Sequence, residues 1–324
     1  MMMDLSLSLT SAWPCAATET GASASSPNGI ATVHARFLRT FPISALPTNL
    51  SLFLIDDKFD LILHFVNGSI YSISRAWAWR RGIGIEEMMQ PIDVERFRRD
   101  GFLAIPQLVG AATVAALADI YDAMLRGEID CSATDNPLGM TTRQIMLPSA
   151  YHPIFRDNPA LDAARDIARD LLGVADPKPV FDMLIYKEPG QLATTPWHQD
   201  YSYAQMPLTP AGTLVPSDEY VQFWVALDDV DEENGCMHFV PGAHDAPLLD
   251  HYIAGGDADY SQRLLAIRDP EAALDLTKAV ACPLKAGGAT VHNYGTPHFT
   301  SGNRTTARPR RAYIFNFSTR DRGA

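Results

Sequence analysis

Three residues of this chain carry side chains that could bind one metal ion together. His198 and Asp200 stand two positions apart in the segment 195–200. If that segment is a β-strand, both side chains project from the same face, so an imidazole and a carboxylate meet at one point. His298, from the distant segment 296–300, could add a second imidazole. The sequence therefore predicts two nitrogen ligands and one oxygen ligand on one face of a metal.

This ligand set limits which metals can bind and which reactions they can support. Two neutral imidazoles and one carboxylate suit Fe(II) and leave open positions for a chelating co-substrate and for O2, as in non-haem Fe(II) oxygenases, although zinc can use the same ligands. A His-x-Asp tripeptide alone is weak in a chain with 9 histidines, and His292 is an alternative to His298. The ordered series gives the signal its weight: His198 and Asp200, two glycine turns, His298, then Arg310-Arg311.

The series resembles the phytanoyl-CoA dioxygenase (PhyH) family of Fe(II)/2-oxoglutarate-dependent oxygenases. The resemblance runs from about residue 92 to about residue 319. It is carried by the segments 183–187 (MLIYK), 197–200 (WHQD), 224–228 (WVALD), 233–236 (ENGC), 240–244 (VPGAH), 298–303 (HFTSGN) and 310–312 (RRA). The family fold, a double-stranded β-helix (jelly roll, cupin-like), is expected here.

The resemblance also implies which residues act. His198, Asp200 and His298 would be the catalytic residues that bind Fe(II), with 2-oxoglutarate and O2 as co-substrates. The far carboxylate of 2-oxoglutarate needs a fixed cation, and a planar, always charged guanidinium serves best. Arg308, Arg310 and Arg311 are candidates, and the family pattern selects Arg310; strand alternation then places Arg311 on the opposite face with Tyr313 and Phe315. Further contacts to 2-oxoglutarate implied by the resemblance are Thr300, Trp224, Met183 and Gln144.

The expected reaction is hydroxylation of an aliphatic C–H bond in a small molecule, with release of succinate and CO2. Halogenating relatives lack the carboxylate, so Asp200 favours hydroxylation. The substrate region is expected in residues 201–220 and 131–140, with Tyr201, Tyr203 and Gln222 as contacts. Two alternatives remain: a non-catalytic jelly-roll protein that binds a small molecule, and a zinc hydrolase, which has no use for Arg310. Substrate identity, oligomeric state and the choice between hydroxylation, desaturation or another oxidation stay open, as does whether residues 1–88 exist in the native protein.

The elements that must position these residues are mainly β with flanking helices. Apolar runs bounded by turn signals predict strands at 141–147, 181–186, 220–227, 236–240, 289–292 and 312–317. Asn234-Gly235 predicts a hairpin turn and Gly287-Gly288 a second turn. Helices are expected at 93–100, at 111–125 and from the Asn158 cap to Gly173, packed on one sheet as a scaffold.

Composition sets limits on partners and location. The chain has 324 residues and a formal net charge of -12, which argues against binding nucleic acid or an anionic membrane. Its 4 cysteines are scattered, so we expect a reducing, cytoplasmic location without disulfides. Residues 1–88 lack the pattern of the rest and are expected to be a poorly ordered N-terminal extension, with Met88 or Met89 the natural first residue; residues 89–324 would be the dioxygenase domain.

Overall fold

The structure is a computed structural model of the whole chain, and it describes part of it. It gives the backbone of residues 4–10, 30–36, 52–56, 61–66 and 69–74, and the fold of residues 92–138, 142–205, 208–216, 219–254 and 264–320. The chain divides into two compact units, Met1–Met88 and Met89–Ala324. Each unit is described by itself below.

The described strands of the first unit form one antiparallel sheet in the order β2-β1-β3-β4-β5. Their bounds are β1 Asp4–Thr10, β2 Ile30–Arg36, β3 Leu52–Asp56, β4 Leu61–Val66 and β5 Ser69–Ser74. The other residues of this unit lie outside the described residues. The expectation of a poorly ordered extension therefore stays a prediction.

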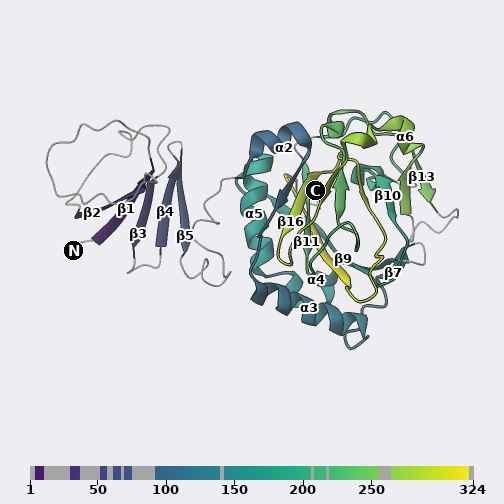
Figure 1. The fold of residues 1–324 in the computed structure, drawn as a ribbon, viewed down its shortest axis with the longest axis horizontal. Helices are drawn as coiled ribbons and strands as arrows, with labels where there is room; N and C mark the ends of the chain where they lie inside the picture. Colours follow the sequence, from purple (N-terminus) through teal and green to yellow (C-terminus); the bar gives the residue numbers. More distant parts are fainter. Residues whose placement is uncertain are drawn as a thin grey trace. The chain divides into compact units, whose positions relative to one another are not determined.

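The second unit contains two sheets that form the expected jelly roll (Figure 1). The larger sheet has the order β6-β16-β11-β18-β9-β8-β7 and the smaller one the order β10-β17-β12-β15, with a separate β13-β14 pair. The bounds are β6 Phe102–Ile105, β7 Asp135–Leu138, β8 Thr142–Met146, β9 Lys178–Lys187, β10 Thr195–His198, β11 Tyr220–Ala226, β12 Met237–Phe239, β13 His251–Ala254, β14 Leu264–Ile267, β15 Val280–Cys282, β16 Ala289–Asn293, β17 His298–Thr300 and β18 Arg310–Ser318.

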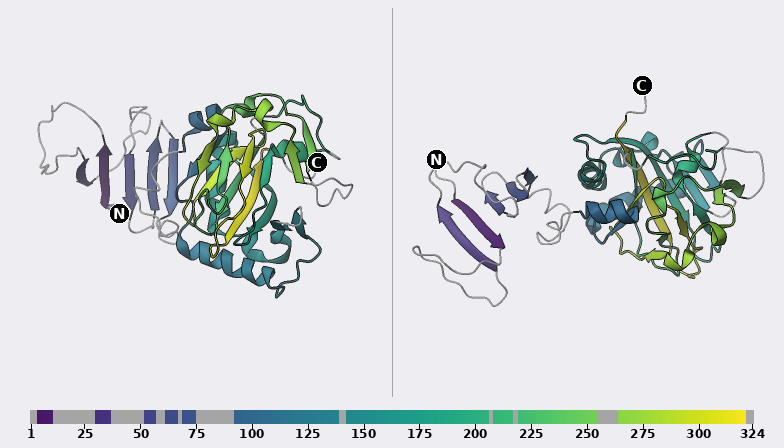
Figure 2. Two further views of the ribbon diagram at one scale, coloured as in Figure 1. Left: turned by 45° about the vertical axis from the view of Figure 1, so that its right-hand side comes forward. Right: turned by 90° about the horizontal axis from the view of Figure 1, so that it is seen from above.

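Helices cover the outer face of the larger sheet, as the apolar spacing predicts (Figures 1 and 2). The helices on this face are α2 Val94–Asp100, α3 Ala111–Leu125 and α5 Pro159–Leu172. The described residues also form the short helices α4 Pro148–Tyr151 and α6 Pro270–Ala273 and the 3-10 turns η3 Pro153–Phe155, η4 Asp200–Tyr203, η5 Ala243–Asp245 and η7 Leu276–Lys278. One apolar core joins α3 and α5 to residues such as Phe223 and Phe315 on the sheet. A second core, which includes Trp224 and Phe239, lies between the two sheets.

The local helix signals act as expected. Asn158 caps α5, because its side-chain oxygen accepts hydrogen bonds from the backbone N–H groups of Ala160 and Leu161, and Pro159 occupies the first turn. Gly101 ends α2 at a φ of +82°, a conformation that favours glycine. A Cβ at Gly101 would also stand 2.5 Å from His244 Nδ1, so this position has no room for a side chain.

The Asn234-Gly235 turn differs from the prediction. Gly235 has a φ of +96°, and its N–H donates to Asp231 O, so a tight turn is present. However, β11 before the turn belongs to the larger sheet and β12 after it to the smaller one. The expected hairpin is therefore wrong: turn residues fix the local backbone, whereas pairing depends on strands that arrive from elsewhere in the chain. The Gly287 turn, with a φ of +93°, is confirmed.

Candidate metal centre and co-substrate site

The smaller sheet brings the two predicted histidines together. β10 and β17 pair antiparallel, with His198 opposite His298. The strand ends at His198, and Asp200 opens η4; Gln199 between them keeps an extended backbone (φ -119°, ψ 130°), so the expected alternation still holds. The carboxylate consequently turns toward the same side as the two imidazoles.

The donor atoms of these three residues are close enough to share one ion. The Nε2 atoms of His198 and His298 each lie 3.7 Å from Asp200 Oδ1. All three ligand atoms lie within 4.8 Å of one another. Metal–ligand bonds to nitrogen and oxygen are about 2 Å long, so an ion among the three atoms could reach all of them with small adjustments. The two imidazoles are buried, at 7% and 3% exposure.

Backbone carbonyls set the tautomer of both histidines. His198 Nδ1 lies 2.8 Å from Pro196 O, and His298 Nδ1 lies 2.9 Å from Thr296 O. A carbonyl only accepts, so each Nδ1 carries the proton and each Nε2 lone pair is free for a metal. Burial lowers the pKa of His198 and holds the pKa of His298 well below its usual value. Both effects favour the neutral imidazole, which is the form that binds metals.

Two further side chains hold the carboxylate from behind. Asp200 Oδ2 accepts a hydrogen bond from Gln222 Nε2 at 2.7 Å and lies 3.1 Å from His292 Nε2. His292 Nδ1 is buried and has no hydrogen-bond partner among the described residues, so Nε2 is the nitrogen that donates. Oδ1 is thereby left facing His198 and His298. Gln222, expected at the substrate, and His292, considered as a ligand, both lie against Asp200.

Charge around Asp200 favours its ionised form. Burial by itself raises the pKa of this carboxyl. The positive charge that the neighbouring histidines carry when protonated, that of His298 first, and the hydrogen bond from His292 lower it by more, so the net pKa lies below the usual value. An ionised carboxylate between two neutral imidazoles is a donor set for a divalent cation.

Of the three candidate arginines, Arg310 is the one that the structure leaves without a carboxylate among the described residues. Arg308 is paired with Asp231 at 2.8 Å, and Arg311 with Asp228 at 2.6 Å. Arg310 is 1% exposed, its Nε donates to Gly235 O at 3.0 Å, and its guanidinium lies 4.7 Å from the centre of the Trp224 ring. Burial lowers the pKa of Arg310 to about 10. A buried cation of this kind requires an anionic partner.

The other expected co-substrate residues lie on neighbouring strands of the larger sheet or on β17. Trp224 is opposite Ile314, which is opposite Met183, and Gln144 Nε2 lies 2.8 Å from Met183 Sδ. Thr300 Oγ1 lies 2.8 Å from Lys187 Nζ. Lys187 is fully buried and was not predicted as a site residue. The signal was present in the alternation of Met183, Ile185 and Lys187 along one strand face.

The expected substrate region is described only in part. Tyr203 packs edge-on against the His198 ring at 6.1 Å, and its hydroxyl accepts from Leu265 N at 3.1 Å. Cys131 is buried in the helix-side core. Residues 139–141, 206–207 and 217–218 lie outside the described residues. The role of these loops in substrate binding stays a prediction.

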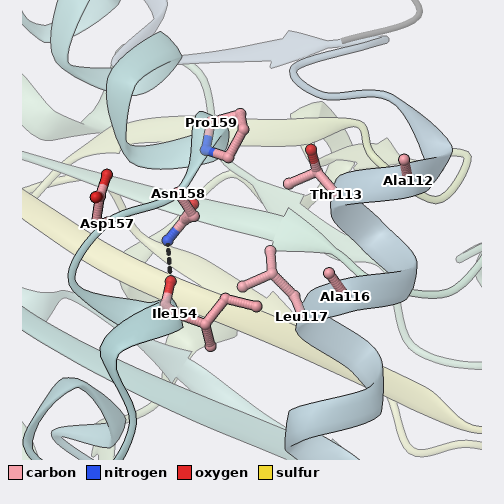
Figure 3. A pocket seen from close by; sticks show the side chains of 8 residues that line it. All are labelled: Ala112, Thr113, Ala116, Leu117, Ile154, Asp157, Asn158 and Pro159. Carbon is pink, nitrogen blue, oxygen red and sulfur yellow. Dashed lines mark hydrogen bonds between the residues drawn. The ribbon is translucent and has the colours of Figure 1, made fainter. Parts of the chain in front are cut away.

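Another pocket lies on the helical side of the domain (Figure 3). It is formed by α3 and the segment that leads into α5, and Asn158 Nδ2 there donates to Ile154 O at 2.8 Å. Its lining includes none of the predicted metal or co-substrate residues. The predicted metal and co-substrate residues therefore lie elsewhere in the domain.

A jelly roll that gathers two imidazoles and one carboxylate between its sheets is the framework of non-haem Fe(II) oxygenases. The chain belongs to the phytanoyl-CoA dioxygenase (PhyH) family, whose profile matches residues 97–312. Of the helices that the structure describes, none combines the length and apolar character needed to cross a bilayer.

Curated and solved relatives agree with this family. The chain is 27% identical over 183 residues to phytanoyl-CoA dioxygenase domain-containing protein 1 of Danio rerio, a match over 52% of this chain and 53% of that protein. The chain thus spans about half the length of this curated relative. The structure of EvdO2 from Micromonospora carbonacea var. aurantiaca, complexed with 2-oxoglutarate, is 33% identical with a TM-score of 0.57, covering 71% of this chain and 90% of that one. The epimerase SnoN, solved with Fe3+, alpha ketoglutarate and nogalamycin RO, is 25% identical with a TM-score of 0.52, covering 69% of this chain and 81% of that one.

Proposed function

We propose that this protein is an Fe(II)- and 2-oxoglutarate-dependent dioxygenase that hydroxylates an aliphatic C–H bond of a small molecule. The observation that carries the proposal is the pairing of two features between the sheets. One is a set of three metal-donor atoms within 4.8 Å of one another. The other is a buried arginine without a carboxylate partner among the described residues, next to Trp224. A zinc hydrolase would need the first feature but not the second.

The residues at the site fit both iron and 2-oxoglutarate. His198, Asp200 and His298 would hold the iron, because their tautomers and charges leave two nitrogen lone pairs and one carboxylate oxygen on the same side. Arg310 would bind the distal carboxylate of 2-oxoglutarate, with Thr300 beside it. Trp224, Met183 and Gln144 would line the same space. Iron, with 2-oxoglutarate and O2, supplies an oxidant for C–H bonds and releases succinate and CO2.

The protein's own contribution would be positioning and exclusion of water. Gln222 and His292 fix one carboxylate oxygen, so that the other keeps its direction toward the metal. Burial of the imidazoles and the guanidinium excludes water and keeps the local dielectric constant low, so charge–charge interactions there are stronger than in water. A small organic substrate and a cytoplasmic location belong to the same proposal. The described cysteines, Cys131, Cys236 and Cys282, are all free and buried, which suits a reducing compartment.

Succinate release tests the proposal without knowledge of the substrate. Protein loaded with Fe(II) and given 2-oxoglutarate in air should form succinate by uncoupled turnover, and His198→Ala should reduce it to the level of metal-free protein. His238→Ala is the matched control, because this histidine lies on the neighbouring strand β12 and packs against Phe299, away from the metal. Wild-type protein that binds 2-oxoglutarate but forms no succinate would instead support the non-catalytic binding protein.

A further inference from the structure

Lys187 is a buried cation that the proposed metal centre does not use. It is fully buried on β9, directly opposite Arg310 on β18. No carboxylate of the described residues lies within ion-pair distance of either cation, although Arg308 and Arg311 nearby each have one. Two adjacent buried positive charges without an anion are costly unless a ligand supplies one.

The hydrogen bonds of Lys187 fix a neighbouring hydroxyl. Lys187 Nζ lies 2.8 Å from Thr300 Oγ1, 2.8 Å from Ser301 O and 3.3 Å from Ala193 O. An ammonium group has three donors and no acceptor, so these three oxygens accept all of its protons. Thr300 Oγ1 therefore accepts from Lys187, and its own proton must point elsewhere. No described residue accepts a hydrogen bond from that proton.

Arg310, like Thr300, has N–H or O–H groups that donate to no described residue. Its Nε donates to Gly235 O at 3.0 Å, and no described residue accepts from its two terminal nitrogens. Lys187 thus links two groups that can still donate hydrogen bonds. It contacts the Thr300 hydroxyl, and it lies opposite Arg310 on the neighbouring strand. Burial and the Arg310 charge hold the pKa of Lys187 well below its usual value.

We propose that Lys187 is a positioning residue: it orients the Thr300 hydroxyl as a donor to the distal carboxylate of 2-oxoglutarate, while Arg310 binds the same carboxylate as its charged partner. This inference rests on the proposed function and names how the site selects its co-substrate. A 2-oxo acid that ends in a second carboxylate meets the whole donor set. A 2-oxo acid that ends in a methyl group gains nothing from it and leaves the cations unpaired.

The test compares binding of two 2-oxo acids to the full chain by calorimetry, without O2 and with a divalent metal present. 2-Oxoglutarate has the distal carboxylate, and 2-oxopentanoate has the same chelating end without it. Lys187→Met should weaken 2-oxoglutarate binding at least about tenfold, as expected for loss of a hydrogen bond to a charged group, and leave 2-oxopentanoate within about twofold. Equal losses for both acids, or no loss for either, would overturn the proposal.

Thr300 gives a second and independent arm. Thr300→Val should discriminate between the acids as Lys187→Met does, whereas Thr300→Ser, which keeps a hydroxyl, should restore most of the affinity. Because Lys187 acts through Thr300, Lys187→Met in the Thr300→Val background should cost little more than Thr300→Val alone. If the losses of affinity from the two substitutions add fully, Lys187 does not act through the Thr300 hydroxyl, and its proposed positioning role is overturned.

Controls separate this inference from the proposed function and from misfolding. Lys178→Met, at the start of the same strand where the side chain is partly exposed, should change neither affinity. Metal binding by Lys187→Met should equal that of wild type, which shows that the fold is intact. If Lys187→Met does not fold, Thr300→Val still tests the proposal, because unchanged binding of 2-oxoglutarate by that variant would overturn it. Wild-type protein that binds no 2-oxoglutarate would contradict the proposed function itself.

Discussion

At the scale of single residues, the proposed metal centre depends on groups other than its three proposed ligands. Gln222 Nε2 donates to Asp200 Oδ2 at 2.7 Å, and His292 supports the same oxygen. Removing one such support lets the carboxylate rotate away from the metal. Partners of this kind typically contribute about 10–100-fold to metal affinity.

Gln222→Leu should therefore weaken divalent metal binding by about 10–100-fold while the protein stays folded. The substitution keeps most of the side-chain volume and removes the donor to Asp200. Competition titration with a metal chelator measures the affinity, and circular dichroism checks the fold. Unchanged metal affinity would show that Asp200 does not depend on Gln222.

Arg310 and Arg308 form a natural comparison, because both are arginines near the start of β18. Arg310→Met should weaken 2-oxoglutarate binding by about 100-fold or more, since two charge-assisted hydrogen bonds are lost. Arg308→Met should have little effect, because its guanidinium is part of a half-exposed ion pair with Asp231. Calorimetry in the presence of metal gives both affinities, and equal values for the two variants would contradict the assignment.

At the scale of elements, the end of α2 is a point where the backbone and the packing both require glycine. Gly101 has a φ of +82°, and a Cβ there would stand 2.5 Å from His244 Nδ1 and 2.7 Å from Thr296 Oγ1. Gly127, with a φ of +74°, has nothing within 4 Å of its hypothetical Cβ. The two positions share the backbone cost and differ in the steric one.

Gly127→Ala should cost about 1 kcal/mol in the free energy of unfolding, which is the order of the backbone strain alone. Gly101→Ala should cost clearly more, about 2–4 kcal/mol, because His244 and Thr296 must also move. Urea denaturation of both variants measures the difference. Equal losses would show that the neighbours of Gly101 yield without cost.

β13 is tied to the segment that carries two of the proposed metal ligands by a neutral histidine. His251 Nε2 accepts from the Gln199 backbone N–H at 3.1 Å, and Nδ1 donates to Leu249 O at 2.8 Å. Burial lowers the pKa of His251 from 6.5 to about 4. Since the folded state disfavours the proton, the stabilising contribution is complete above pH 6.5 and is lost as pH falls from 6.5 toward 4.

Unfolding free energy of the metal-free protein should thus fall with decreasing pH across this window. His251→Leu should reduce the slope by up to about one proton, because one group that binds a proton only in the unfolded state is gone. Denaturant titrations at several pH values between 4 and 6.5 give both slopes. Identical slopes would indicate that His251 is not held neutral in the folded protein.

At the scale of the whole molecule, the residues that define the family and the proposed site all lie beyond residue 88. The family profile begins at residue 97, and the second compact unit begins at Met89. The placement of the dioxygenase domain at 89–324 remains our proposal. It implies that the first unit contributes no metal or co-substrate residue.

Deletion of residues 1–88 should leave the affinities for metal and 2-oxoglutarate within about twofold of those of the full chain, because every proposed ligand lies beyond the deletion. Calorimetry on both proteins measures this, and thermal melting shows whether the shortened chain folds. A folded but non-binding protein would place part of the site, or its support, in the first unit.

The sequence was most informative where the chemistry is local. Three predictions that depend on residues a few positions apart are confirmed. They are the Asn158 N-cap, the helix end at Gly101 and the strand alternation that separates Arg310 from Arg311. The Asn234-Gly235 hairpin was wrong, because turn chemistry does not decide which sheet receives the next strand. Lys187 beside Thr300, and Gln222 behind Asp200, depend on strand register between distant segments, which no local pattern specifies.

The most direct measurement of the central claim is a crystal structure of the full chain with Mn(II), as a redox-stable substitute for Fe(II), and 2-oxoglutarate, with the metal located by anomalous scattering. We expect the metal about 2.0–2.3 Å from His198 Nε2, Asp200 Oδ1 and His298 Nε2, and the distal carboxylate on Arg310. A metal bound elsewhere, or 2-oxoglutarate bound without contact to Arg310, would contradict the account.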